Sequence, residues 1–328
     1  SSIFLSQPLL DPVLPRRTRF ELQVSESNTL AYSPNVERSP SWNLLQGNIN
    51  LHQPQTGIDA GLLAAWAAAH PQQTYLFADT ETTRLAMAAT VPLAPRWGLR
   101  LELPLQAHWG GLLDEVIKGW HRLLNFPDLG RSFTPSGHTQ LFAARGNQSV
   151  WFDGSSALDL GDLVARGLYA VRDEDGHGPA VLLAASLKAP TGAASRLAGS
   201  GRWEHGLSLS AAQTLGDFRL YAGGGYTWHS GWKALSEMPI ANTLDLHAGL
   251  EMRVGRQWSW QMQVSREEQA LAKAEPTSFG RAAWRLNGAA HYRLGPDVVL
   301  DWSFGENLSE NADTEDFTMR TGLRWSAF

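Results

Sequence analysis

A histidine and an aspartate that share one face of an extended segment are the best candidates for chemistry in this sequence. Asp245 and His247 are two residues apart, a spacing that places both side chains on the same face of a strand. His205 has two serines nearby, Ser208 and Ser210, but they fall on the opposite parity. No hydrolase motif surrounds these residues, and geometry defines such a site more than residue type does. We therefore expect a protein that is not an enzyme, with a hydrolase as a remote alternative.

Metal ligands are equally sparse. His247 and His291, even together with Asp245 and Asp301, lack the short ligand spacing of a metal site. The acidic stretch that begins at Asp173 has no glutamate at the twelfth position of a calcium loop. The chain contains no cysteine, which removes disulfides and thiolate sites. We expect neither a metal nor another cofactor.

The elements that must position these residues are long strands. From Trp284 to Leu294 apolar and polar side chains alternate with a period of two. Gly295-Pro296 interrupts this run, and the alternation resumes from Val298 to Phe304, which predicts a hairpin closed by a tight turn. The same unit recurs over residues 244–264. Each strand has about ten residues, enough for a tilted strand to cross the hydrocarbon core of a bilayer.

Alternation of this kind continues along most of the chain. We count about 12 long strands, an even number as in bacterial single-chain barrels. Tight turns alternate with long connections, so both termini should lie at the short-turn end. A β-propeller is the competing all-β architecture, but its blades use four short strands each. We therefore predict an all-β fold: a closed antiparallel transmembrane β-barrel of about 12 strands with one short amphipathic helix in a long extracellular loop.

The average composition resembles that of a soluble protein. Hydrophobic residues make up 43% of the chain and the mean hydropathy is -0.25, but membrane barrels escape such tests because every second residue is polar. The net charge is -5 and the basic residues are scattered, so we expect no nucleic-acid partner. Several tryptophans fall at strand ends, where indole rings meet a membrane interface: Trp109, Trp203, Trp228, Trp258, Trp284 and Trp325.

Three irregular parts interrupt the strand pattern of what we predict to be one barrel domain, residues 1–328. Residues 1–16 are rich in proline and read as a periplasmic lead-in. Residues 34–73 and 110–157 are expected to form long extracellular loops. The first loop contains an alanine-rich segment that predicts a short helix starting near Asp59.

The second loop contains the one strong amphipathic helix signal. Over residues 112–126 the apolar side chains follow helical spacing, and Pro127 ends the run. They are Leu112, Leu113, Val116, Ile117, Trp120, Leu123 and Leu124. This helix could be a plug or lid over a pore, could lie in the membrane interface, or could simply pack on the barrel mouth. Residues 140–145 and 149–153 predict a small hairpin in the same loop.

Side chains opposite the apolar parity are expected to face the lumen, and many are charged. The candidates for lining it are Arg84, Arg100, Glu102, Arg166, Arg219, Asp245, His247, Glu251, Arg285, His291, Arg293 and Asp301. Such groups either pair across strands and brace the barrel or line a polar path, and bracing is favoured because buried charges need partners. A barrel of this size has an interior between that of filled eight-strand barrels and that of open porins, which favours a narrow or plugged pore.

Several short motifs support the same class. They are Trp109-Gly110-Gly111-Leu112-Leu113-Asp114 followed by Trp120-His121, then Gly161-Asp162, residues 186–192, residues 197–201 and the closing Leu323-Arg324-Trp325. In these motifs, over residues 80–328, the chain resembles an uncharacterised proteobacterial family of predicted outer-membrane β-barrel proteins. The resemblance implies an outer-membrane location rather than a particular chemistry.

The function we expect is passive uptake of small molecules through a narrow or plugged outer-membrane channel. The alternative is a non-conducting surface barrel whose loops bind a partner or lipopolysaccharide, and the remote one is an outer-membrane lipid hydrolase. The expected partners are outer-membrane lipids and lipopolysaccharide, the outer-membrane insertion machinery and an unidentified small solute. We expect a monomer.

Overall fold

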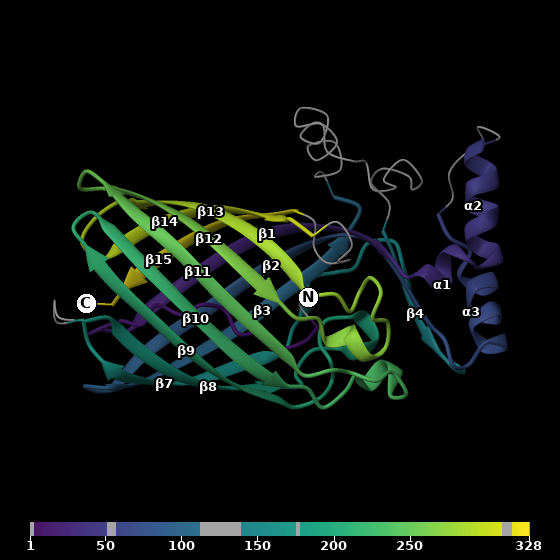
Figure 1. The fold of residues 1–328 in the computed structure, drawn as a ribbon, viewed down its shortest axis with the longest axis horizontal. Coiled ribbons are helices and arrows are strands. Elements are labelled where there is room, and N and C mark those ends of the chain that lie inside the picture. Colours follow the sequence, from purple (N-terminus) through teal and green to yellow (C-terminus); the bar gives the residue numbers. More distant parts are fainter. Residues whose placement is uncertain (1–2, 51–56, 112–138, 175–177, 310–316, 328) are drawn as a thin grey trace.

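The computed structural model describes residues 3–50, 57–111, 139–174, 178–309 and 317–327, and within these ranges twelve strands form a closed antiparallel barrel (Figure 1). The barrel strands are β1 (Arg19–Tyr32), β2 (Thr74–Ala94), β3 (Trp97–Trp109), β7 (Leu163–Arg172), β8 (Ala180–Ala189), β9 (Glu204–Leu215), β10 (Phe218–Trp228), β11 (Thr243–Val254), β12 (Trp258–Glu267), β13 (Ala283–Arg293), β14 (Val298–Asn307) and β15 (Phe317–Ser326). Each strand pairs with its neighbours, and β1 pairs with β15 to close the wall. The predicted fold class is confirmed.

Shorter elements lie in the connections. They are α1 (Pro34–Glu37), α2 (Pro40–Asn50), α3 (Ala60–Ala69), β4 (Gln140–Arg145), β5 (Gln148–Asp153), β6 (Asp159–Leu160), η2 (Ala194–Arg196), η3 (Lys233–Leu235) and η4 (Ala270–Lys273). The predicted hairpin corresponds to β4 and β5, and the predicted short helix to α3, whose first turn is capped by the Asp59 carboxylate accepting from Leu62 N at 2.9 Å. The predicted helix 112–126 lies outside the described residues. No helix of the described part is long and apolar enough to span a membrane.

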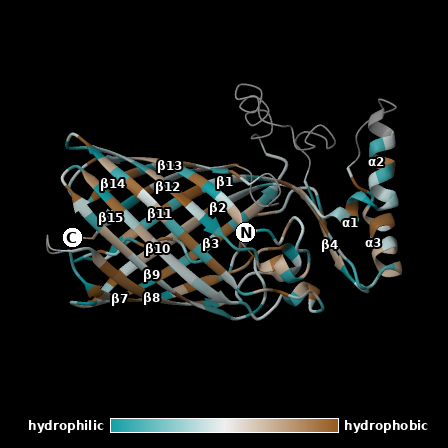
Figure 2. Cartoon of the chain, viewed as in Figure 1, coloured by the Kyte–Doolittle hydropathy of each residue, from teal (hydrophilic) through white to brown (hydrophobic). Residues whose placement is uncertain are grey.

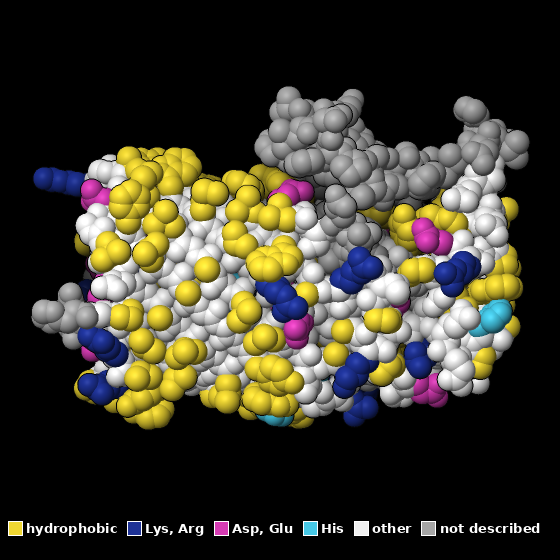
Figure 3. All heavy atoms as spheres, viewed as in Figure 1, with side chains coloured by type: hydrophobic (Ala, Val, Ile, Leu, Met, Phe, Trp, Pro, Cys, Tyr) yellow, Lys and Arg dark blue, Asp and Glu magenta, His cyan; other side chains and the backbone are white. Residues whose placement is uncertain are grey.

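Strand alternation gives the barrel an apolar exterior. On β12, Trp260, Met262 and Val264 are 52%, 61% and 40% exposed, whereas Ser265 on the other face is buried. Hydrophobic side chains are distributed over the visible barrel wall, and charged ones gather mainly toward its ends (Figure 3). An apolar surface that encircles a protein is unfavourable in water but matches the hydrocarbon of a bilayer. The wall therefore faces lipid.

The two ends of the barrel differ. Tight turns join β9 to β10 at Gly216 and β11 to β12 at Gly255, where φ is +65° and +69°, a conformation that glycine adopts without strain. β1 begins and β15 ends at this short-turn end, close to the C label of Figure 1. The longer connections that hold η2, η3 and η4 lie at the opposite, long-loop end.

A three-stranded extension projects beyond the long-loop end. The first six residues of β2 pair with β4 instead of β3, and β4 pairs with β5. One face of this extension packs against α1, α2 and α3 through Tyr75, Phe77 and Phe142. On the other face of the extension, Leu76 joins side chains of several long connections in a second apolar cluster. Figure 2 shows the apolar residues of α3, the helix that packs on the first face, in brown. The sequence predicts β2 only from about Thr83, because its outer part pairs with a distant hairpin.

Residues 3–15, called the N-terminal segment below, run inside the barrel without regular secondary structure (Figure 1). Near the long-loop end the carbonyl of Ile3 accepts from Lys188 Nζ at 3.0 Å. Near the short-turn end the carboxylate of Asp11 accepts from Arg219 at 2.9 Å. The sequence predicts a periplasmic lead-in here. The segment is irregular as predicted, but it lies in the lumen because polar groups of the wall bind its backbone and side chains.

Candidate functional site in the barrel lumen

Four buried ionisable side chains form what we call the anchor cluster: Asp162, Lys188, Glu204 and His229. Lys188 Nζ lies 2.5 Å from Asp162 Oδ2 and 3.1 Å from Glu204 Oε1. His229 Nδ1 lies 2.9 Å from the other oxygen of Glu204. None of these side chains is more than 3% exposed. One ammonium therefore sits between two carboxylates in a dry environment, where each charge depends on the others.

The anchor cluster binds the start of the N-terminal segment. Lys188 donates to the carbonyl of Ile3, and Glu204 Oε2 accepts from Leu5 N at 2.7 Å. Asp162 also accepts from Gly192 N at 2.8 Å and Ser200 N at 3.1 Å, which ties the loop before β9 to the same point. Four of these residues, Asp162, Lys188, Gly192 and Ser200, belong to motifs that carried the family resemblance. The motifs thus include the groups that hold the segment in the lumen.

Gln7 is the best-bound residue of the N-terminal segment. Its backbone N–H donates to Asp245 Oδ2 at 3.0 Å, and its carbonyl accepts from His247 Nε2 at 3.0 Å. Its side-chain amide donates to Thr227 and accepts from Ser186, both at 3.0 Å. Gln7 is 1% exposed. With all four of these groups satisfied, Gln7 fixes both the position and the direction of the segment.

Glycines in the wall make room for the segment, and we call Gly206, Gly223 and Gly225 the glycine groove. A Cβ at Gly225 would lie 2.4 Å from Gln7 Cβ, and one at Gly206 would lie 2.2 Å from the Gln7 amide nitrogen. A Cβ at Gly223 would lie 2.6 Å from a methyl group of Leu9. Gly223 and Gly225 both face inward on β10. Glycine is needed here because the segment touches the strand backbone.

Apolar contacts and ion pairs hold the second half of the segment. Leu10 and Leu14 pack on a buried apolar patch of β7 and β8 that includes Leu168 and Leu182. Asp11 pairs with Arg219 at 2.9 Å and lies 3.9 Å from Arg19. The segment is thus bound along its length by side chains of at least five different strands, yet no part of it joins the sheet.

A second charged group, here called the Glu102 cluster, braces the wall between β1, β2, β3 and β7. Glu102 lies 2.5 Å from Arg84, 3.2 Å from Arg166 and 3.9 Å from Arg100. Arg100 also pairs with Glu21 at 2.8 Å. The Glu102 side chain is 13% exposed and that of Arg166 is 4% exposed. A single carboxylate therefore offsets the charge of several guanidinium groups that are partly shielded from water.

Replacing Glu102 by glutamine is expected to lower the free energy of unfolding by about 2 kcal/mol, because three arginines then lose a shared counter-charge that is partly exposed. The midpoint of urea-induced unfolding in detergent micelles measures this effect. Glu237→Gln, at an exposed position after η3, is the matched control and should leave the midpoint unchanged. Equal midpoints for both variants would contradict the bracing role of Glu102.

A third charged group lies on β13, β14 and β15. Asp301 binds His291 Nδ1 at 2.5 Å and Arg324 at 2.6 Å, while His291 Nε2 contacts Gln261 Oε1 at 2.9 Å. Arg285 donates to Thr318 Oγ1 at 3.3 Å. All of these groups lie on the inward parity of their strands. The arrangement ties neighbouring strands together next to the seam between β1 and β15.

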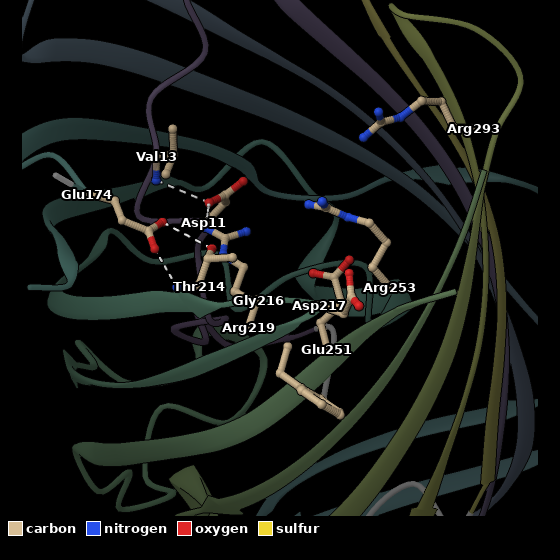
Figure 4. A pocket seen from close by; sticks show the side chains of 11 residues that line it. Asp11, Val13, Glu174, Thr214, Gly216, Asp217, Arg219, Glu251, Arg253 and Arg293 are labelled. Atoms are coloured by element: carbon tan, nitrogen blue, oxygen red, sulfur yellow. Dashed lines mark hydrogen bonds and ion pairs between the residues drawn. The ribbon is translucent and has the colours of Figure 1, made fainter. Parts of the chain in front are cut away.

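The structure distributes the twelve predicted lumen residues among distinct groups. Arg84, Arg100, Glu102 and Arg166 form one cluster, and His291 and Asp301 form another with Arg324. Asp245, His247 and Arg219 bind the N-terminal segment. Glu251 and Arg293 line a cavity at the short-turn end (Figure 4). Arg285 stands apart beside Thr318.

The sequence does not predict that the N-terminal segment lies in the lumen, or that His229 belongs to the cluster that binds it. One signal was available: Gly223-Gly224-Gly225 interrupts an otherwise apolar and polar alternation in β10. Glycine inside a strand is a sign of close backbone approach. The sequence suggests helix 112–126 as a plug, and these residues lie outside the described ranges.

His247, a candidate for hydrolase chemistry, and His291, a candidate metal ligand, have no serine partner among the described residues. The ring of His205, the other hydrolase candidate, stacks on Trp228 at a centroid distance of 5.2 Å. His247 contacts the Gln7 carbonyl and, at 3.4 Å, the Gln263 amide. His291 contacts Asp301 and Gln261. In a serine hydrolase the second imidazole nitrogen faces the nucleophilic hydroxyl, and here an amide oxygen or a backbone carbonyl takes that place. Within the described chain, no group of three or more histidine, aspartate and glutamate side chains is arranged to hold a metal ion.

A closed wall of twelve strands with an apolar exterior and a polar, charged interior defines an outer-membrane β-barrel protein. This confirms the predicted class and location. Within that class, the chain belongs to the family described as "Protein of unknown function (DUF3187)", whose model matches residues 25–326. The family membership confirms the resemblance inferred from the sequence motifs.

Solved structures of similar fold are outer-membrane barrels. The COG4313 outer membrane channel from Pseudomonas putida F1 has a TM-score of 0.57 and 12% identity, covering 96% of this chain and 97% of that one. The KdgM porin has a TM-score of 0.41 and 8% identity, covering 78% and 97%. The P. putida toluene transporter TodX has a TM-score of 0.41 and 10% identity, covering 96% and 91%. No protein of curated function matches the sequence.

Proposed function

We propose that this protein is an outer-membrane channel for the passive uptake of small polar molecules, and that its N-terminal segment is the plug that closes it. The observation that carries the proposal is the position of that segment: it occupies the lumen of a closed barrel without joining the sheet. With the segment gone, the inner wall would present charged and amide side chains that water can solvate. A wall of this kind suits polar solutes.

The contacts that hold the plug are of a kind that allows it to be displaced. Its contacts are individual hydrogen bonds: those with neutral groups contribute about 0.5–1.5 kcal/mol each, and those with Lys188, Glu204 and Asp245 about 1.5–3 kcal/mol each. The side chains of Arg219 and Asp11 are 26% and 32% exposed, and ion pairs that water reaches in this way contribute about 1 kcal/mol or less. A solute at the short-turn end could therefore shift the Asp11 end of the segment without unfolding the barrel.

Channels and porins among proteins of similar fold fit this function, and we infer no enzymatic activity. The lumen residues described above would then have two roles. Those in the Glu102 cluster and around Asp301 brace the wall, and those facing the plug or the cavity meet the solute. The protein would act as a monomer surrounded by outer-membrane lipids and lipopolysaccharide, placed there by the insertion machinery.

A second candidate function is a surface barrel that binds a partner or lipopolysaccharide without conducting. The observation that favours it is the exposed apolar surface of the helices beyond the barrel: Leu44 on α2 is 52% exposed and Leu62 on α3 is 37% exposed. Apolar side chains gathered outside the membrane belt are a common mark of an interaction surface. This candidate predicts no solute flux, whether or not the plug is present.

Deleting residues 3–14 is expected to raise solute flux by at least tenfold, because the deletion removes what fills the lumen and leaves the strands intact. Osmotic swelling of liposomes that carry the folded protein measures this flux for small sugars and amino acids. Heat-modifiable migration on gels verifies that both proteins form barrels. The intact protein and protein-free liposomes are the controls. Equal, negligible flux for intact and plug-deleted barrels would overturn the channel proposal in favour of the binding barrel.

A further inference from the structure

A polar cavity of about 300 Å³ opens at the short-turn end of the lumen. Its lining comes from the plug, through Asp11 and Val13, from the ends of β9, β10, β11 and β13, from the β9 to β10 turn, and from Glu174 after β7. Figure 4 shows the side chains of Arg253 and Arg293 directed into this space from one part of the wall. The volume is at the small end of ligand sites, which suits a molecule of amino-acid size.

The charges in this cavity differ from those elsewhere in the lumen. In the Glu102 cluster and around Asp301 every carboxylate has a guanidinium partner. By contrast, Asp217, Glu251, Arg253 and Arg293 line the cavity without an ion pair or side-chain hydrogen bond to another described residue. Glu251 faces Arg219 across the β10 to β11 pair, but within the described chain it makes no direct ion pair with it. Charged side chains without a directly bound partner are available to a ligand.

The side chains of these four residues are separated by sign, although their backbones are not: Arg253 N–H donates to the Asp217 carbonyl at 2.8 Å, and Glu251 is on the same strand as Arg253. In Figure 4 the carboxylates of Asp217 and Glu251 lie next to each other, and the guanidinium groups of Arg253 and Arg293 lie above them in the view. A cavity that is acidic toward one side and basic toward the other complements a molecule with an ammonium at one end and a carboxylate at the other.

The plug shows how a carboxylate is recognised here. Asp11 projects from the segment into the same cavity and binds Arg219 at 2.9 Å. A solute carboxylate is chemically equivalent to this side chain, and Arg253 and Arg293 offer it two further guanidinium groups. Binding of a solute would therefore place a competing charge next to the contact that holds the end of the plug.

We propose that this cavity is a binding site for small zwitterionic solutes, with the carboxylate directed to Arg253 and Arg293 and the ammonium directed to Asp217 and Glu251. The inference rests on the proposed function, since it names the class of solute that the channel would pass. It makes a separate prediction, however, because binding at the cavity does not require that the plug move.

The test compares three related probes: glutamine, N-acetylglutamine, which lacks the ammonium and is larger by an acetyl group, and glutaminamide, which lacks the carboxylate. Saturation-transfer NMR measures their binding to the intact, folded protein in detergent micelles. Glutamine is expected to bind about tenfold more tightly than either derivative, since each derivative loses one charge-assisted contact. Equal binding of the three probes, or no binding of glutamine, would overturn the proposal.

Variants assign the two ends of the solute. Arg253→Gln should weaken glutamine binding about five- to tenfold and abolish its preference over glutaminamide, while Glu251→Gln should do the same relative to N-acetylglutamine. Arg256→Gln, in the adjacent turn and outside the cavity lining, should change neither preference. If Arg256→Gln also lost the preference for glutamine, the selectivity would come from the overall electrostatic potential of this end of the barrel and not from a binding site in the cavity.

The liposome flux measurement keeps this inference separate from the channel proposal. Selective binding of glutamine without any flux, even from the plug-deleted barrel, would support the site and refute the channel. Flux through the plug-deleted barrel that does not distinguish the three probes, together with equal binding, would support the channel and refute the site.

Discussion

Replacing Lys188 by methionine is expected to lower the free energy of unfolding by about 3–5 kcal/mol, the largest loss of stability of any single change considered for this protein. Methionine fills a similar volume, but it leaves the carboxylates of Asp162 and Glu204 without the ammonium that lies within 2.5 Å and 3.1 Å of them. Their side chains are 2% and 0% exposed, so water cannot replace the lost cation. The effect exceeds that of Glu102→Gln because the Glu102 side chain is more exposed.

Urea unfolding in micelles, followed by tryptophan fluorescence, measures the loss. Lys233→Met, an exposed lysine on η3, is the matched control and should change the unfolding free energy by less than about 0.5 kcal/mol. Adding Asp162→Asn to Lys188→Met should recover part of the loss, because one uncompensated carboxylate disappears. A loss below about 1 kcal/mol in Lys188→Met, with no recovery in the double variant, would contradict the anchor cluster as described.

Replacing Gly225 by valine is expected to displace the plug while the barrel stays folded, and so to raise solute flux without any deletion. Any Cβ at this position would overlap Gln7, whose own Cβ would be only 2.4 Å away. The clash should raise the free energy of the plugged state by about 1–3 kcal/mol and leave that of the open state unchanged. The ratio of open to plugged barrels would then rise roughly 5- to 150-fold. Liposome swelling reports the change directly.

The matched control is Gly167→Val, which places the same side chain on the lipid-facing side of β7, where an added Cβ meets nothing within 4 Å. This variant should fold and conduct as the unaltered protein does. Both variants are first tested for heat-modifiable migration. If Gly225→Val forms a barrel yet passes no more solute than Gly167→Val, the glycine groove has no part in closing the lumen.

The barrel itself could be predicted from the sequence because its cause is local. Successive side chains of each strand point to the lipid and to the lumen in turn. The alternation in runs such as Trp258 to Val264 therefore indicates both the strand and the face on which each residue lies. Tight turns at Gly216 and Gly255 then fix which strands are neighbours. Parity also separates lipid-facing from lumen-facing side chains, which is why residues as far apart as Arg84 and Asp301 could be grouped in advance.

The plug could not be predicted, because nothing local defines it. Residues 3–15 carry several prolines and no period, and they bind partners more than 170 positions away, as Lys188 and Asp245 illustrate. The outer part of β2 was missed for a related reason, since its partner β4 follows a long connection. The sequence indicates which side chains face inward, but pairing among them depends on the order of strands round a closed wall.

The position of the plug also constrains how the barrel is assembled. The wall closes where β1 meets β15, in a register that runs from Arg19 with Ser326 to Asn28 with Phe317. The two strands of this seam are about 300 residues apart in the chain. The plug is continuous with β1 and reverses direction just before it. While that seam is open, the plug can be laid sideways onto β8 to β11; once it is closed, the segment would have to be threaded lengthwise through the lumen. We therefore expect the plug to bind the wall before β1 pairs with β15.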